Sequence, residues 1–506
     1  MSKKLKGLAK IELTNVETGE TKVQYEKNIV TNAIPNLYAS NPFGACFVHA
    51  SPVELMGGLL LYNEDITEDV NNTEIPRTPD AWAGNGVSNG TSTKRGNAVL
   101  QESVVTPNGC KLVWEFGTAQ GNGSYKSICL TNPHLCNNDV FGVASDYNEN
   151  PMFYGGHQPL SAYENSLQGI GIELLTSATI STYGSTAAHP WFIDLKNGHF
   201  YSITYNPSAT TTLTLNRVTR KADSVPIGQS NNGDDGDELK MARKGVFYYD
   251  PVSINITLKN PLSTNTNTKI SSVHYVEETN KLYIFTLTSN TNTIYKTIID
   301  LNTFTANGVE VSESVLTYND VKYWIYRSNN NDSFYTIGPN KIGFKYPYIY
   351  LPTYDDKMLI YKLNVDDITD TRILSGKANY SDSTQTATYG DTLTLGNFIV
   401  SPGYYIIDTK MNTVTEGPPA NAMTYRLGNS YVSRPPFTLG KHYIMNKWIS
   451  TERNNSRYYG DSTAYCYGHS FFLNPFYLAT INNVTPFEKT SSQVMRITYT
   501  ITEEDA

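Results

Sequence analysis

The sequence predicts an all-β fold on the basis of three observations. Near the C-terminus, Met495, Ile497, Tyr499 and Ile501 alternate with polar residues, and a period of two is typical of a half-buried strand. Short apolar runs separated by polar turns fill the middle of the chain, between residues 189 and 450. No amphipathic pattern extends beyond a few helical turns. We therefore expect strands and turns along almost the whole chain.

The N-terminal segment carries the same alternation. Ile11 and Leu13 lie on one face of an expected strand, a turn follows at Glu17–Glu20, and Val23 and Tyr25 alternate with polar residues on the returning strand. This pattern predicts a β-hairpin. Because a terminal strand needs a partner, we expect both chain ends to pair within one β-sandwich-like domain.

A second hairpin is predicted around the glycine-rich turn at residues 117–123. Trp114 and Phe116 share one face of the strand before the turn, and Ile128 and Leu130 lie on the strand after it. This hairpin would add a heavy aromatic face to the terminal domain.

Residues 63–101 read as a long loop in which Trp82 is nearly the only large apolar side chain. Loops of this length are usually functional or are ordered by a neighbour. We expect this segment to make subunit contacts.

The central region predicts a repeated unit in which an apolar strand ends at an Asp or Asn before a polar turn. Four residues mark these strand ends: Asp194, Asp300, Asn364 and Asp408. A short carboxylate or amide at this place accepts N–H bonds from the turn two residues on. Taking roughly 40 to 50 residues for a blade, the spacing favours a β-propeller of about five blades. A solenoid or an irregular pair of sandwiches would show similar hairpins.

The expected domain organisation has four parts. Residues 1–150 form the β-sandwich-like attachment domain, residues 151–188 a linker, residues 189–450 the inserted propeller-like domain, and residues 451–506 a loop and closing strands that return to the N-terminal domain.

Composition excludes several classes of function. The 506 residues carry a net charge of -8 without a sustained Lys/Arg stripe, so we expect no nucleic-acid partner. No apolar run reaches the length of a signal peptide or the roughly 18 residues of a membrane span. We expect synthesis in a cytoplasm, without the usual export route and without membrane insertion. The five cysteines show no close metal or redox spacing, so buried thiols are favoured over a disulfide framework.

The sequence contains no motif for a metal enzyme, a serine hydrolase or a nucleotide-using enzyme. We therefore expect no catalytic residues, no metal and no cofactor. A glycosidase needs only two carboxylates, which leave no local signature, and Glu277, Glu278, Asp355 and Asp356 are available for that role. The acidic segment Asp234–Glu238 is interpreted as a solvated loop, with a calcium site as the alternative.

Two groups of aromatic residues are candidates for ligand contact. Phe344, Tyr346, Tyr348 and Tyr350 share one face of an expected strand, where core packing is favoured over a glycan platform. The preferred surface candidates lie in a polar loop and are Arg457, Tyr458, Tyr459, Tyr465 and Tyr467. An interface with a neighbouring subunit explains that loop equally well.

Several segments of the two flanks resemble a known group of proteins. They are Leu13–Gly19, Val113–Gly123, Ser127–Thr131, Leu478–Asn483 and Thr498–Thr502. These segments are similar to stretches of tail-associated structural proteins of bacteriophages that infect Gram-positive bacteria. The central repeats carry no such resemblance.

The resemblance implies a virion protein of the tail, fibre or baseplate, assembled in the host bacterial cytoplasm. It implies other phage tail proteins as partners, a homo-oligomeric state, and adhesion of the displayed propeller to a host-surface glycan. A tail-borne glycan depolymerase and a purely structural adaptor are the alternatives.

Overall fold

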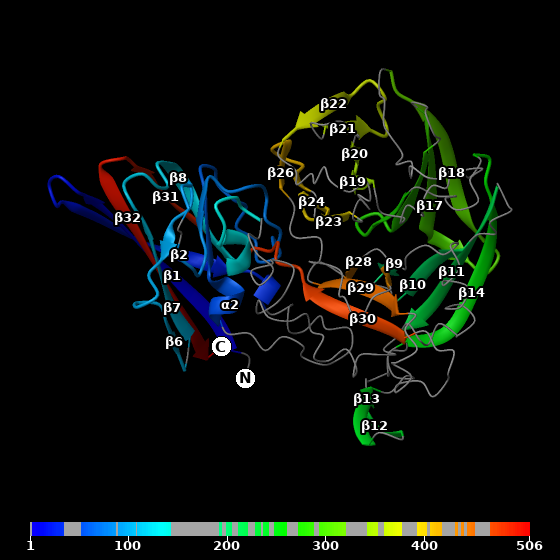
Figure 1. Ribbon diagram of the computed structural model, residues 1–506, viewed down its shortest axis with the longest axis horizontal. Coiled ribbons are helices and arrows are strands. Elements are labelled where there is room, and N and C mark those ends of the chain that lie inside the picture. Colours follow the sequence, from blue (N-terminus) through cyan, green and yellow to red (C-terminus); the bar gives the residue numbers. More distant parts are fainter. Residues whose placement is uncertain are drawn as a thin grey trace.

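The structure is a computed structural model of the chain (Figure 1). The residues that it describes are 3–34, 52–87, 90–107, 109–142, 192–194, 199–204, 211–220, 228–233, 236–241, 247–260, 272–287, 293–319, 342–352, 359–376, 392–401, 405–416, 431–433, 437–439, 443–450 and 466–505. The expected linker at residues 151–188 lies outside this set.

Both ends of the chain belong to one large ten-stranded sheet with the order β4-β3-β8-β31-β2-β1-β32-β7-β5, in which β6 also pairs with β7. Its strands are β1 (Lys3–Asn15), β2 (Thr21–Val30), β3 (Gly58–Tyr62), β4 (Ala81–Ala83), β5 (Asn97–Ala98), β6 (Val104–Thr106), β7 (Gly109–Phe116), β8 (Gly123–Thr131), β31 (Thr480–Lys489) and β32 (Gln493–Asp505). The short helix α2 (Pro52–Met56) and the 3-10 helix η1 (Pro133–Cys136) accompany it.

The predicted pairing of the chain ends is confirmed. β1 runs antiparallel to β32 over its whole length, with Lys3 opposite Asp505 and Asn15 opposite Gln493. The opening hairpin is confirmed as well, because β1 also pairs with β2. The two termini therefore lie side by side at one end of the large sheet (Figure 1).

The terminal domain is a near-closed barrel-like sheet and not the expected sandwich. One continuous sheet curls round until its two edges approach each other. Trp82 of β4 forms a bridge with Arg95, and Gly96 N donates to Trp82 O at 2.9 Å. Alternating apolar residues suit a sandwich and a barrel equally well, so the closure depends on strand twist and not on the pattern alone.

The second predicted hairpin is wrong, although both of its strands exist. β7 pairs with β32, β5 and β6, whereas β8 pairs with β3 and β31. The turn at residues 117–123 thus carries the chain across the barrel instead of folding it back on itself. Consecutive strands with matching patterns need not be partners.

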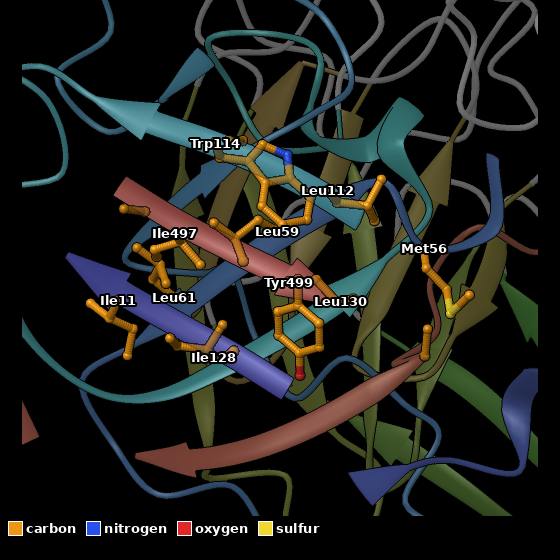
Figure 2. Packing of buried hydrophobic residues seen from close by; sticks show 14 of the residues in the cluster. Ile11, Met56, Leu59, Leu61, Leu112, Trp114, Ile128, Leu130, Ile497 and Tyr499 are labelled. Atoms are coloured by element: carbon orange, nitrogen blue, oxygen red, sulfur yellow. The ribbon is translucent and has the colours of Figure 1, made fainter. Parts of the chain in front are cut away.

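The core of the barrel is filled by the inward-facing residues of its strands (Figure 2). Ile11 of β1 lies opposite Ile497 of β32, which in turn lies opposite Trp114 of β7. Leu59 and Leu61 of β3 face the same core. The alternation that predicted half-buried strands therefore marks the residues that fill the barrel.

Residues 63–101 are not a free arm in this structure. They supply β4 and β5, and Ile66, Ile75 and Trp82 are buried. The Trp82 indole N–H donates to Asn138 O at 3.0 Å. The expected subunit contacts of this segment remain a prediction.

Five small four-stranded antiparallel sheets follow along the chain. The first contains β9 (Phe192–Asp194), β10 (His199–Thr204), β11 (Thr212–Arg220) and β14 (Phe247–Thr257), with the separate hairpin β12 (Gly228–Gly233) and β13 (Gly236–Met241) between β11 and β14. The second contains β15 (Ser272–Val276), β16 (Lys281–Leu287), β17 (Thr293–Thr305) and β18 (Gly308–Thr317). The third contains β19 (Gly343–Lys345), β20 (Tyr348–Pro352), β21 (Leu359–Asn364) and β22 (Thr371–Ser375).

The fourth small sheet contains β23 (Leu393–Leu395), β24 (Phe398–Ser401), β25 (Tyr405–Asp408) and β26 (Thr413–Glu416). The fifth contains β27 (Tyr431–Ser433), β28 (Phe437–Leu439), β29 (Tyr443–Ser450) and β30 (Cys466–Leu473). Because β30 pairs with β29, the small sheets extend past residue 450, where the domain boundary was expected.

The Asp and Asn residues of the repeated unit stabilise turns as predicted at three of four positions. Asp300 Oδ1 accepts from Asn302 N at 3.1 Å, Asn364 Oδ1 from Asp366 N at 2.9 Å, and Asp408 Oδ1 from Lys410 N at 3.0 Å. All three lie in the third strand of their sheets. Asp194 ends the first strand of its sheet, so it does not mark the same position of the unit.

The fourth small sheet shares an apolar core with the barrel. Leu60 and Tyr62 of β3 lie on the outer face of the barrel. They belong to one buried cluster with Phe398 and Ile406 of the fourth sheet. The Phe398 ring lies 5.0 Å from that of Phe476, between centroids. β3 is therefore buried on both faces, which explains its uninterrupted apolar run.

Polar contacts reinforce this junction. Asp408 Oδ2 accepts from Thr78 N at 2.6 Å and from Thr78 Oγ1 at 2.7 Å, and Asn397 Nδ2 donates to Pro76 O at 2.8 Å. Beside them, the buried Arg77 donates from Nε to Glu64 Oε1 at 2.8 Å. The barrel and the fourth sheet are thus joined by apolar packing and by directional bonds.

The three cysteines whose side chains the structure describes, Cys110, Cys129 and Cys136, are free and buried, as predicted. Burial raises the pKa of Cys110 to about 11 and that of Cys129 to about 12. Within the described part of the chain, no helix has the length and apolar character needed to span a bilayer.

Candidate functional site

Most of the predicted ligand-binding residues lie outside the described residues: Arg457, Tyr458, Tyr459 and Tyr465. For Tyr467 the backbone is described, and it pairs with Ile449 of β29. These residues remain a prediction.

The candidate acidic residues fall into two groups. Glu277 and Glu278 are exposed in the turn between β15 and β16. Asp355 and Asp356 lie outside the described residues, as do Asp234 and Asp235 of the acidic segment. Across the described positions, no group of three or more His, Cys, Asp or Glu side chains is arranged to hold a metal ion.

The four aromatic residues at 344–350 do not share a strand face, so that prediction is wrong. β19 ends at Lys345 and β20 begins at Tyr348, and a turn at Tyr346–Pro347 separates the two strands. Proline has no N–H to offer to a ladder, which explains why the strand is interrupted. Phe344 and Tyr350 are buried in core clusters, whereas Tyr346 is 51% exposed.

Tyr346 is the centre of a polar surface site between the second and third small sheets. Its hydroxyl donates to Asp366 Oδ2 at 2.7 Å, and Lys296 Nζ donates to Asp366 Oδ1 at 3.0 Å and to Val365 O at 2.7 Å. The ring of Tyr283, from the second small sheet, lies 5.8 Å from that of Tyr346. Two neighbouring sheets therefore position one exposed ring beside a carboxylate and an ammonium group.

These contacts shift the pKa values of the pair. The hydrogen bond to Asp366 raises the pKa of Tyr346 to about 12. Partial burial raises the pKa of Asp366, but the hydrogen bonds from Tyr346 and Lys296 outweigh it, so the pKa lies below its ordinary value. Near neutral pH the tyrosine is a hydroxyl donor and the aspartate is ionised.

A second tyrosine–aspartate pair lies at the same end of the third small sheet. Tyr348 Oη donates to Asp370 Oδ2 at 2.7 Å, and Asn364 Nδ2 lies 3.2 Å from the same oxygen. Lys362 Nζ lies 4.1 Å from the centroid of the Tyr348 ring and 2.6 Å from Asn412 Oδ1. The β19–β20 turn and the β21–β22 connection place both pairs at one end of the sheet, because alternate connections of an antiparallel sheet lie at one end. The first pair lies beside Tyr283 and Lys296 of the second small sheet, whereas the second pair lies on the side of the fourth small sheet.

We call Tyr346, Tyr348, Asp366 and Asp370, together with the buried Lys296 that pairs with Asp366, the Tyr–Asp surface. An exposed aromatic ring packs against the apolar face of a sugar, and carboxylate oxygens accept hydrogen bonds from its hydroxyls. The surface is thus suited to binding a polar, uncharged or cationic glycan.

The sequence pattern marks Tyr346 and Tyr348 as aromatic candidates, with core packing as the favoured role, but it does not single out Asp366, Asp370 or Lys296. Asp366 and Asp370 follow Asn364 in a turn. Acidic residues are common in turns because water solvates them, so their presence there indicates no binding partner. Lys296 lies in a different small sheet, 70 positions before Asp366. No local signal in the sequence connects these residues.

Ser272 and His274 form a close pair that could be mistaken for a catalytic dyad. Ser272 Oγ lies 2.6 Å from His274 Nε2, but Ser272 is fully buried. The imidazole packs 5.2 Å from the Phe344 ring, between centroids. Burial of the ring lowers the pKa of His274 to about 3, so this half-buried residue is neutral near neutral pH.

This histidine should make stability depend on pH. Its pKa of about 3 in the folded protein lies below the 6.5 expected for the unfolded chain, so its contribution is complete above pH 6.5 and is lost as the pH falls toward 3. Between pH 7 and pH 5 we expect it to lower the free energy of unfolding by about 2 kcal/mol. Urea titrations of the wild type and His274→Gln at both pH values measure this. Equal losses in the two proteins would contradict the assignment.

Comparison of the chain with known proteins finds no matching family model and no matching curated protein.

Proposed function

We propose that the chain is a structural or adhesive protein of a bacteriophage tail, fibre or baseplate. The resembling segments support this proposal by their location. Val113–Gly123 covers the end of β7 and the turn after it, and Ser127–Thr131 covers the end of β8. Leu478–Asn483 covers the start of β31 and the two residues before it, and Thr498–Thr502 lies within β32. They all belong to the barrel, which would attach the protein to other tail proteins of the particle.

The small sheets would then form the displayed part, as a propeller of about five blades. Successive sheets share apolar clusters: Ile203 with Ile284, Phe285 with Ile349, and Ile360 with Ile399. The first strands of neighbouring sheets lie near each other, as β19 of the third sheet and β23 of the fourth do. The last strands do the same, as β14 of the first sheet and β18 of the second show. β28 of the fifth sheet lies near β9 of the first. This order agrees with blades arranged around a ring.

The insertion of the small sheets between β8 and β31 suits a displayed module. The chain leaves the barrel after β8 and re-enters it at β31, and the small sheets lie between these two strands in the sequence. The fourth sheet packs on the barrel through the cluster around Phe398. This packing would therefore fix the orientation of the small sheets relative to the barrel.

The observation that carries the adhesive function is the exposed Tyr346 ring held beside the ionised Asp366. We propose that the Tyr–Asp surface binds a glycan of the host cell surface. A single site of this size binds weakly, and many copies on one particle make the attachment effective.

Replacing Tyr346 by alanine tests this site. Loss of one stacking ring costs roughly 1–1.5 kcal/mol, so we expect about a tenfold weaker affinity. Ile373→Ala is the matched control, because Ile373 is 56% exposed on the outer strand of the same sheet. The measurement is retention of the full chain on purified cell walls of Gram-positive bacteria, followed by titration with soluble wall fragments.

The outcomes separate the proposals. Equal affinity of the two variants would exclude the Tyr–Asp surface, and no retention of the wild type, even when multimerised, would exclude adhesion to these walls. Release of new reducing ends during incubation would instead support a glycan depolymerase.

A further inference from the structure

Lys489, the last residue of β31, carries a charge that is buried in the barrel. The residue is 1% exposed, and its Nζ donates to Asn122 Oδ1 at 2.7 Å and lies 3.5 Å from the carbonyl oxygens of Thr118 and Thr490. All three acceptors are neutral, and within the described ranges no carboxylate pairs with this ammonium group. Burial lowers the pKa of Lys489 to about 8, so the charged form still predominates at neutral pH. A buried cation without a counter-ion reduces the stability of a fold.

Asn122, the partner of this ammonium group, is exposed in the glycine-rich turn before β8. Its amide is held at both ends, because Oδ1 accepts from Lys489 Nζ while Nδ2 donates to Thr118 O at 3.0 Å. Gly123 follows as the first residue of β8 and lies opposite Lys489 in the ladder between β8 and β31 (Figure 1). Its φ of +152° is one that residues with a side chain rarely adopt. Solvent therefore reaches an Asn–Gly step whose side-chain oxygen is bonded to a fixed positive charge.

An Asn–Gly step can convert itself into an acidic residue, because glycine has no side chain to hinder attack of its backbone nitrogen on the preceding Cγ. As Gly123 N adds to Asn122 Cγ, the nitrogen loses its proton to water and negative charge develops on Oδ1. A charged donor already placed at that oxygen stabilises the developing charge. The Cγ–Nδ2 bond then breaks, ammonia leaves with a proton from solvent, and a five-membered succinimide remains. Water opens this ring to aspartate or isoaspartate.

We propose that Asn122 is a self-modification site: it deamidates through attack by Gly123, assisted by Lys489, and the carboxylate that forms becomes the counter-ion of Lys489. The net reaction consumes one water and releases one ammonia. The buried ammonium group promotes the reaction and is stabilised by its product. The barrel would thus gain an ion pair between β31 and the β7–β8 turn after it has folded. This inference does not depend on the proposed glycan adhesion.

The chain contains a second Asn–Gly step of the same backbone geometry, which serves as an internal control. Asn307 is exposed in the turn before β18, and Gly308 is the first residue of that strand, with a φ of +158°. Asn307 N donates to Thr305 Oγ1 at 3.2 Å. Among the residues that the structure describes, no ammonium group bonds to the Asn307 side chain. The two steps therefore differ in the presence of a lysine at Oδ1.

Ageing of the full chain at neutral pH tests the reaction, with peptide mass spectrometry following the gain of one mass unit at each step. We expect Asn122 to react at least about tenfold faster than Asn307, because one charged hydrogen bond in the transition state is sufficient for that factor. Lys489→Met removes the ammonium group and keeps the length of the side chain. It should slow Asn122 to about the rate of Asn307 and leave Asn307 unchanged.

The ion pair is tested separately by making the product directly. Asn122→Asp should raise the urea midpoint above that of freshly prepared wild type, and this gain should vanish when Lys489→Met is also present. Asn307→Asp is the matched control and should give no gain.

Each result decides the question. Reaction at Asn122 that is no faster than at Asn307 would overturn the proposal, and so would a folded Lys489→Met variant that reacts as fast as the wild type. An unchanged or lower urea midpoint for Asn122→Asp would exclude the ion pair. If Lys489→Met does not fold, as judged by circular dichroism, the comparison of the two Asn–Gly steps and of the two aspartate variants decides alone.

Discussion

Ile497→Ala is expected to lower the free energy of unfolding of the barrel by about 2–4 kcal/mol. Ile497 is fully buried in the barrel core, and β32 lies between β1 and β7, so its side chain packs where three strands meet. Removing its side chain beyond Cβ leaves a cavity that the closed sheet cannot easily collapse. Equilibrium urea unfolding of the full chain, followed by tryptophan fluorescence, measures the loss.

The control for this prediction is on the same strand. Thr498 is half-buried and points to the opposite face, so Thr498→Ala should cost less than about 1 kcal/mol. Similar costs for the two variants would contradict the assignment of the inner face of β32.

A truncation after residue 492 should abolish the barrel altogether, because it exposes the edges of β1 and β7 together.

Asp408→Ala is expected to destabilise the junction between the barrel and the fourth small sheet by about 2–4 kcal/mol. Asp408 is 2% exposed and accepts from Thr78 N, Thr78 Oγ1, Lys410 N and Met411 N. Alanine removes the acceptor of three backbone donors, and the two bonds from Thr78 are lost at the junction itself. Hydrogen exchange of residues 73–80 and 405–411 measures the local loss, and urea unfolding measures the global one.

The chain offers a matched control in the second small sheet. Asp300 stabilises the corresponding turn but is more exposed, and it accepts from Asn302 and Lys281 without contacting the barrel. Asp300→Ala should therefore cost less than about 1 kcal/mol. If the two variants are equally destabilised, Asp408 acts only through its own turn and the junction does not depend on it.

The fold could be predicted wherever the pattern and the partner are both local. The hairpin of β1 and β2 follows from the alternation around Glu17–Glu20, and the turns at Asp300, Asn364 and Asp408 follow from a short side chain at a strand end. The pairing of β1 with β32 was also predictable, because terminal strands with exposed edges need a partner. The partners of β7 and β8 were not, since both strands are apolar enough to lie anywhere in the sheet.

The candidate site was predictable only in part. Tyr346 and Tyr348 stand out by their type, but whether a ring is buried or exposed depends on where the strand ends. Here Pro347 interrupts the ladder and leaves Tyr346 in a turn. Asp366 and Lys296 become partners because two small sheets pack together, and that distance in space cannot be read from their distance in the chain.

Three properties of this protein can be read from its amino-acid pattern alone: it is built of strands, certain residues of its terminal strands face a core, and its two ends belong together. These properties follow from side-chain alternation and from turn chemistry, which act over a few residues. Three other features emerge only in the folded chain: the terminal sheet curls into a near-closed barrel, the outer face of β3 packs on the fourth small sheet, and Tyr346 meets Asp366 at the surface. Those features depend on strand twist and on packing between distant segments, and neither is encoded by a local pattern.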